Sequence, residues 1–235
     1  MSKNTLIRIT VYGFLFLGIS MYFWGRSIWH PVYIKINGKE TTQSIYSKIG
    51  PQIEPKLKKY FKDQNLNFPT DKICLIAIKD EQILEIWSEG KLIKTYPFTG
   101  YSGDLGPKLK SGDGQIPEGL YNIEYLNPNS SYHLSMKISY PNSFDQQVAQ
   151  NENRSNLGGD IFIHGNSVTI GCIPIGNKNI EELFILAHKT GKNNIDVIIT
   201  PVDFRKNDNT FKKNDPKWLI QKYKRIKNAL IKYKS

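Results

Sequence analysis

The longest uninterrupted hydrophobic stretch lies near the start of the chain, where residues 9–24 form a run of 16 positions without a charge. Lys3 and Arg8 precede this run, and Arg26 closes it. The run is longer than a buried strand and somewhat shorter than the ~20 residues that span a bilayer comfortably. Because no small-x-small cleavage site follows, the pattern predicts an uncleaved signal anchor over residues 1–30. A buried helix of a soluble protein is the alternative.

Three further segments place their hydrophobic side chains at helical spacing. Residues 53–61 form one hydrophobic stripe with lysines around it, and Pro55 is compatible only with the first turn of such a helix. Residues 179–189 show the same spacing. Residues 215–233 predict an amphipathic C-terminal helix that docks on the body of the protein. A helix lying on an acidic surface is the alternative.

Between these helices the hydrophobic period changes to two, which is typical of strands. In residues 73–78, Ile73, Leu75 and Ala77 are expected to point to one face of a strand, and Cys74, Ile76 and Ile78 to the other. Glu89-Gly90 separates two later runs and predicts a hairpin. The predicted strands begin near residue 71 and continue at 82–88, 91–98, 119–125, 132–138, 160–164 and 195–200.

Two further segments show no regular period over their whole length. Residues 99–117 contain five glycines and two prolines and are expected to be largely turn and loop. Residues 127–159 are rich in Asn, Ser and Gln and form either a lid over a site or a solvated surface excursion. We therefore expect a mainly β domain with a few helices over residues 71–205, after a stem and helix at 31–70 and before a basic helix at 206–235.

Composition and charge narrow the class of protein. With 39% hydrophobic residues in 235, the chain can form one sizeable core or two small ones and is not disordered. The net charge is +11, but residues 206–235 alone carry +8 of it. The rest is nearly neutral and lacks the basic face of a nucleic-acid-binding protein. Of the two cysteines, Cys74 lies in a strand pattern and is expected in the core.

The segment with the clearest chemistry is residues 158–175, which read GGDIFIHGNSVTIGCIPI. A short hydrophobic strand ends at His164, and Cys172 follows eight residues later. At its ordinary pKa of about 8.5 a thiol is only a few per cent thiolate at neutral pH, so it needs a base to attack a carbonyl. Gly165 and Gly171 permit close approach of a substrate to the backbone. The residues predict either a Cys-His pair or an inert cysteine beside a core histidine.

These residues resemble a known family. Residues 164–165 (His-Gly) and 169–172 (Thr-Ile-Gly-Cys) are similar to the active-site motif of the YkuD-type L,D-transpeptidases, a His-Gly followed by Ser/Thr-x-Gly-Cys. Further blocks in the same order resemble the YafK-like murein L,D-transpeptidase branch of this family. They lie at residues 105–109, 112–119, 127–132, 140–145 and 180–183.

The resemblance implies a β-sandwich-like catalytic domain that acts on peptidoglycan stem peptides. Cys172 would attack the carbonyl at the L-centre of the diamino acid and form a thioester, and His164 would take the thiol proton and pass it to the leaving amine. In this family a backbone carbonyl orients the imidazole, and the N–H groups at Gly171 and Cys172 match the oxyanion donors. Gly165 matches the glycine after the histidine. No metal or cofactor is implied.

Substrate recognition is less well defined, because the sequence departs from the family pattern. Many relatives have a histidine before the Gly-Cys pair and an arginine two residues after the cysteine, where this chain has Ile170 and Pro174. A stem-peptide carboxylate favours a cationic partner. The candidate substrate-binding residues are the cations Lys108, Arg154 and Arg205, each of which is alternatively a solvated surface charge, and the pocket residues Tyr132, Ser131 and Asn129, which are alternatively ordinary turn residues.

The acyl acceptor decides which reaction follows. An amine acceptor gives transpeptidation, which we expect, whereas water gives an endopeptidase or amidase that releases a wall-linked lipoprotein or peptide. A non-catalytic wall-binding module is a third hypothesis, against which the intact pair of His164 and Cys172 argues. The expected location is the periplasmic face of the cytoplasmic membrane, held there by the N-terminal anchor.

Overall fold

The computed structural model describes residues 3–23, 25–206 and 215–234. The chain divides into two compact units, Met1–Glu40 and Thr41–Ser235. The first unit contains helices α1 (Lys3–Phe23) and α2 (Arg26–Asn37). The second unit contains all the strands of the described residues and four further α-helices.

The predicted membrane anchor is not supported. Helix α1 does form over the hydrophobic run, but no helix within the described ranges combines the length and the hydropathy required to cross a bilayer. The uncharged run has 16 residues, fewer than the ~20 that span a bilayer. Helix α1 reaches 21 residues only by including the charged Lys3 and Arg8.

The second unit is built on one mixed sheet of eight strands in the order β3-β2-β1-β8-β4-β5-β6-β7. The β1–β8 and β6–β7 pairs are parallel, and the other pairs are antiparallel. Long strand β4 joins the two halves, because it pairs with β8 near its start and with β5 further along. The strands are β1 (Ile73–Ile78), β2 (Ile83–Ser88), β3 (Lys91–Pro97), β4 (Gly119–Ser130), β5 (His133–Ile138), β6 (Phe162–His164), β7 (Ile173–Pro174) and β8 (Ile195–Thr200).

This arrangement bears on both parts of the expected fold class. Within residues 71–205 strands hold more residues than helices, which confirms the expected mainly β domain with a few helices. The strands form one continuous sheet, however, instead of the two facing sheets of a sandwich. Hydrophobic period identifies strands well, but it does not decide whether strands join one sheet or two, because that depends on pairing between distant segments.

Helices cover both faces of the sheet, as the hydrophobic pattern of β1 requires. All six residues of β1 are buried. Ile73, Leu75 and Ala77 belong to a core shared with α3 (Thr42–Asp63) and α5 (Asn177–Thr190). The alternate residues of β1 belong to a second core shared with the C-terminal helix.

Helix α3 begins well before its predicted start, and Pro51 and Pro55 lie inside it. Its first turn is fixed by a capping box, in which Thr41 and Ser44 exchange side-chain to backbone hydrogen bonds. The expectation that Pro55 marks the first turn is therefore wrong. Leu57 and Phe61 are fully buried, so packing against the core stabilises a helix that its prolines weaken.

The segment 127–159 is more regular than its composition suggests, and β5 within it confirms the strand predicted at 132–138. It contains the end of β4, all of β5, and helix α4 (Ser143–Asn151). Helix α4 is capped by Asn142, whose side chain accepts a hydrogen bond from Asp145 N–H at 2.9 Å. By contrast, residues 99–117 are loop and turn, as predicted.

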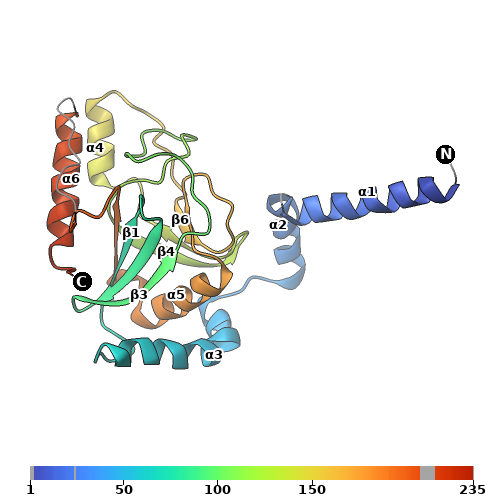
Figure 1. Ribbon diagram of the computed structural model, residues 1–235, viewed down its shortest axis with the longest axis horizontal. Helices are drawn as coiled ribbons and strands as arrows, with labels where there is room; N and C mark the ends of the chain where they lie inside the picture. The colour runs from blue at the N-terminus through green and yellow to red at the C-terminus, as the bar shows by residue number, and fades with distance from the viewer. Residues whose placement is uncertain (1–2, 24, 207–214, 235) are drawn as a thin grey trace. The chain divides into compact units, whose positions relative to one another are not determined.

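The C-terminal helix α6 (Lys217–Leu230) docks on the body of the protein, which confirms the prediction. Figure 1 shows α6 beside α4, and residues of both helices line a small pocket between them. Tyr223, Ile226 and Leu230 of α6 are buried against the face of the sheet that carries Trp87. The lysines of α6 lie mostly on its exposed face, with buried Lys222 as an exception.

Candidate active site

Two short parallel strands bring His164 and Cys172 to the same end of the sheet. His164 is the last residue of β6, and Cys172 immediately precedes β7. The register pairs Ile163 with Ile173, so Cys172 lies level with Phe162. Phe162 and His164 point to the same face, because side chains alternate along a strand. The sulfur and the imidazole therefore lie on the same face of the sheet, on adjacent strands and two positions apart in register.

Both side chains line one cavity of about 350 Å³. The cavity is also lined by Tyr132 and Ser131, two of the three predicted pocket residues, which follow the end of β4, whereas Asn129 is not among the lining residues. The rim includes Val168 and Ile170, which are 47% and 76% exposed. The lining residues are Asn127, Ser130, Ser131, Tyr132, Ser135, Asp160, Phe162, His164, Val168, Thr169, Ile170 and Cys172.

The imidazole of His164 is oriented by a backbone carbonyl, as the resemblance implied. His164 Nδ1 is hydrogen-bonded to the carbonyl oxygen of Gly165. A carbonyl can only accept, so Nδ1 carries the hydrogen and Nε2 is left as the basic nitrogen. The ring of Tyr132 lies over the imidazole, with 4.8 Å between the ring centres. Burial lowers the pKa of His164 below 6.5, against a smaller raising effect of the Gly165 hydrogen bond.

The thiol of Cys172 contacts two backbone groups on the preceding segment. Its sulfur accepts a hydrogen bond from Phe162 N–H at 3.4 Å and donates to the Asp160 carbonyl at 3.6 Å. Burial raises the pKa of Cys172, while Phe162 N–H and the charge of Lys108 act in the lowering direction. The resting pair is therefore a neutral thiol and a neutral imidazole. Such a thiol requires a base at the moment of attack.

The two backbone N–H groups expected to hold an oxyanion already have acceptors. Gly171 N–H donates to Ser102 Oγ at 2.7 Å, and Cys172 N–H donates to Thr169 Oγ1 at 2.9 Å. Gly171 has a φ of +93°, a conformation that favours glycine. A substrate oxygen bound at this turn would have to replace a hydroxyl acceptor. Sequence reasoning missed Ser102, because an isolated serine in a glycine-rich loop carries no signal of its own.

Close packing of the backbone explains why position 165 is a glycine. A Cβ at this position would lie 2.7 Å from both the Tyr132 carbonyl oxygen and Asn177 Oδ1. The absence of a side chain therefore lets the residue after His164 pack directly against the segment that carries Tyr132.

None of the three predicted cations lines this cavity. Lys108 Nζ pairs with Asp113 at 2.6 Å and acts on Cys172 only through its charge. The guanidinium of Arg205 lies against Trp87, next to the C-terminal segment. It is ion-paired with Asp203 at 2.7 Å and with Glu85 at 3.0 Å, and Arg154 is paired with Glu152 at 2.7 Å. The structure thus places Arg205 in a structural ion-pair network away from the cysteine.

Cys74 is a buried, free thiol, as predicted, and burial raises its pKa to about 12. In the described part of the chain, no group of three or more His, Cys, Asp or Glu side chains is arranged to hold a metal ion. The cavity itself brings together a thiol and an imidazole oriented by a backbone carbonyl, which are the two groups that nucleophilic catalysis by a cysteine requires.

Comparison of the sequence with known proteins identifies a family and a relative of this chain. The family model of the YkuD L,D-transpeptidase catalytic domain matches residues 71–199. The protein YafK of Escherichia coli (strain K12), which carries the name of an L,D-transpeptidase, is 30% identical over 167 residues. That match covers 67% of this chain and 63% of YafK, so the chain spans less than two thirds of this relative.

Two solved structures show a weaker likeness. The helical cell shape determining protein Pgp2 from Campylobacter jejuni is 23% identical with a TM-score of 0.45, over 58% of this chain and 50% of Pgp2. An L,D-transpeptidase from Xylanimonas cellulosilytica DSM 15894 is 13% identical with a TM-score of 0.38, over 57% of this chain and 62% of that one. The family model, however, covers more than half of the chain and includes both His164 and Cys172. The chain therefore belongs to the family of L,D-transpeptidase catalytic domains.

Proposed function

We propose that this protein is a peptidoglycan L,D-transpeptidase that acts through a thioester on Cys172. The acyl donor is a stem peptide, cleaved after the L-centre of its diamino acid, and the acceptor is an amine. The observation that carries the proposal is the common cavity of His164 and Cys172, in which the imidazole is held with Nε2 as its basic nitrogen.

In the first step the sulfur of Cys172 attacks the peptide carbonyl of the donor. The thiol proton leaves its contact with the Asp160 carbonyl and passes to His164 Nε2 as the carbon–sulfur bond forms. The tetrahedral intermediate then breaks its carbon–nitrogen bond. The leaving amine takes the proton from Nε2, and the acyl group remains on sulfur as a thioester.

In the second step an amine of another peptide attacks the thioester carbonyl. His164 Nε2 takes a proton from this amine and delivers it to the sulfur, so that Cys172 returns as a thiol. Water in place of the amine turns the same chemistry into hydrolysis. The enzyme would then release a wall-linked lipoprotein or peptide.

We place the site outside the cytoplasmic membrane, in the periplasm, because the proposed substrate lies there. Within the cavity, Tyr132 and Ser131 are the proposed contacts to the donor peptide. The exposed side chains of Val168 and Ile170 offer apolar contact at the rim, where many relatives have a histidine in place of Ile170. Asp160 is the one acidic or basic residue besides His164 among the lining residues, so the proposal includes no cation for a carboxylate.

The test is to incubate the purified protein with muropeptides and to resolve the products by mass. We expect crosslinked dimers together with a covalent acyl adduct on the peptide that contains Cys172. Cys172→Ala should abolish both, and His164→Gln should slow turnover by about 10²- to 10⁴-fold. Cys74→Ala is the matched control, because it also removes one thiol but from the core behind the sheet.

Each outcome has a definite meaning. Free tripeptide without dimers identifies hydrolysis as the reaction and refutes transfer. Turnover that persists in Cys172→Ala refutes the thioester. A wild-type protein that binds muropeptides without turnover or adduct identifies a wall-binding module.

A further inference from the structure

The loop at residues 99–117, here called the backing loop, contacts the turn that carries Cys172. Ser102 is the direct link, since its Oγ accepts the hydrogen bond from Gly171 N–H at 2.7 Å. The same hydroxyl donates to the Gly114 carbonyl at 2.9 Å. Ser102 therefore joins both sides of the backing loop to the residue that precedes the sulfur.

Two more contacts hold the backing loop against the same segment. Thr99 N–H donates to the Pro174 carbonyl at 2.9 Å, just after the cysteine turn. The Gln115 carbonyl packs so closely that a Cβ on Gly171 would lie 2.8 Å from it. The position of the cysteine turn thus depends on where the backing loop is held.

A buried ion pair holds the backing loop. Lys79 directly follows β1, Glu118 directly follows the loop, and both side chains are fully buried. Lys79 Nζ lies 2.8 Å from Glu118 Oε1 and also donates to the carbonyls of Gly106 at 2.7 Å and Ile116 at 3.1 Å. Glu118 Oε1 accepts Gly106 N–H at 2.8 Å. The pair therefore fastens the loop to the sheet at two points.

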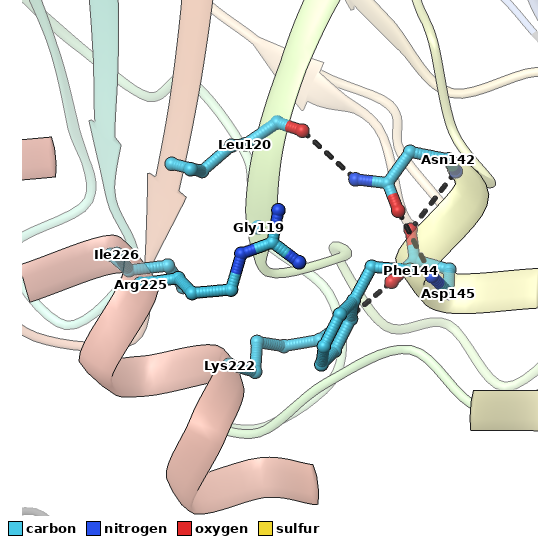
Figure 2. A pocket seen from close by; sticks show the side chains of 8 residues that line it. All are labelled: Gly119, Leu120, Asn142, Phe144, Asp145, Lys222, Arg225 and Ile226. Carbon is cyan, nitrogen blue, oxygen red and sulfur yellow. Dashed lines mark hydrogen bonds and ion pairs between the residues drawn. The ribbon is translucent and has the colours of Figure 1, made fainter. Parts of the chain in front are cut away.

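The C-terminal helix completes this arrangement. Tyr223 of α6 donates its hydroxyl hydrogen to Glu118 Oε2 at 2.8 Å. The neighbouring Lys222 donates to the Glu118 carbonyl at 3.0 Å and pairs with Asp145 of α4 at 2.6 Å. Figure 2 shows Lys222 and Arg225 of α6 facing Phe144 and Asp145 of α4. Every oxygen of Glu118 thus has a donor, and fully satisfied buried networks of this kind are rigid.

We propose that Glu118 and Tyr223 are positioning residues for Cys172. The Tyr223 hydroxyl holds the Glu118 carboxylate, Glu118 holds the backing loop, and Ser102 fixes Gly171 and with it the sulfur relative to His164. The proposal rests on the proposed function, because it assigns α6 to the placement of the nucleophile. Removing the Tyr223 hydroxyl leaves a buried carboxylate oxygen without its donor, so the loop shifts to find another.

The experiment compares Tyr223→Phe and Ser102→Ala with Tyr233→Phe in the full-length protein. Tyr233→Phe is a matched control, because it removes a phenolic hydroxyl from the same C-terminal segment but next to Trp87 and Cys74. The rate at which iodoacetamide modifies Cys172 is followed by mass spectrometry over roughly pH 5–9. In wild type we expect one limb of this profile, in which the modification rate rises with pH, to depend on His164 and to disappear in His164→Gln. Both test variants should lose this limb, and their kcat should fall by about 10- to 100-fold with KM little changed.

Folding and function are separated by two further readings. Circular dichroism identifies any variant that does not fold, and then Ser102→Ala decides, because Ser102 is only partly buried in a loop. Folded test variants that keep the wild-type modification profile overturn the proposal. Because modification by iodoacetamide needs no peptidoglycan, this test of the positioning residues does not depend on the proposed reaction. A failure of the proposed function would be seen in a separate measurement, as muropeptide turnover in Cys172→Ala.

Discussion

The imidazole of His164 is buried, with 1% of its surface exposed, and one of its nitrogens is committed to the Gly165 carbonyl. Burial disfavours the charged form, so this histidine stays neutral to a lower pH than an exposed one. The thiol of Cys172 is affected in the opposite sense, because burial raises its pKa. The two shifts together favour general-base catalysis by a neutral imidazole over a preformed thiolate–imidazolium pair.

This state of the pair predicts the pH dependence of the reaction. Protonated His164 cannot accept the thiol proton, so kcat/KM should fall as the pH falls through the pKa of His164, which lies below 6.5. Tyr132→Ala should expose the imidazole, weaken the effect of burial and move this limb to higher pH. Tyr125→Ala is the control, because Tyr125 is similarly exposed but its ring makes an edge contact with Phe162 instead. A limb above pH 6.5 in the folded wild-type protein would contradict the prediction.

At the scale of elements, α6 packs on the face of the sheet opposite α3 and α5, and α4 lies beside α6 (Figure 1). Helix α4 is tied to the sheet by its cap residue, because Asn142 Nδ2 donates to the Leu120 carbonyl at 2.9 Å (Figure 2). The same side chain accepts Asp145 N–H at the helix start. One amide therefore both begins the helix and attaches it to β4.

Asn142→Ala should lower the free energy of unfolding by about 0.5–2 kcal/mol, because it removes the cap and the link to β4. Urea denaturation followed by circular dichroism measures this change. Ser143→Ala is the control, since Ser143 is the exposed neighbour inside the helix and should change stability little. Equal effects of the two substitutions would show that the cap contributes nothing.

At the scale of the whole molecule, ion pairs between distant parts of the chain join the sheet, the backing loop and the C-terminal helix. The pair of Lys79 and Glu118 is fully buried, and burial lowers the pKa of Lys79 while Glu118 opposes this effect. A buried pair is costly to break, because the remaining charge loses its partner without gaining water. Lys206 makes ion pairs with Glu81 and Asp203, but its side chain is 58% exposed.

The difference in burial predicts different effects of the same substitution. Lys79→Met should lower the free energy of unfolding by about 3–5 kcal/mol, since it leaves Glu118 charged and buried. Lys206→Met should cost less than about 1 kcal/mol, because water and salt screen an exposed pair. Thermal and urea unfolding of both variants give the comparison. If Lys79→Met were as stable as Lys206→Met, the ion pair would not hold the backing loop.

The sequence by itself determined the features that depend on local spacing. The alternation in residues 73–78 predicted a strand whose side chains point to opposite faces, and the stripe in residues 215–233 predicted a docked helix. The His-Gly and Gly-Cys motif predicted the pair of side chains that now share a cavity. These features follow from neighbours within a few residues, because side-chain direction in strands and helices is periodic.

Only the tertiary structure decided the roles of the charged residues and the joining of the strands. Arg205 pairs with Glu85, 120 positions away in the chain, and Tyr223 reaches Glu118 across 105 positions. No local pattern distinguishes such a residue from a free cation that binds substrate, so Lys108 and Arg205 were assigned to the wrong surroundings. The single sheet and the contact of Ser102 with the cysteine turn were missed for the same reason. The partners of charged and hydrogen-bonding side chains depend on how distant segments pack, and local sequence patterns do not show that packing.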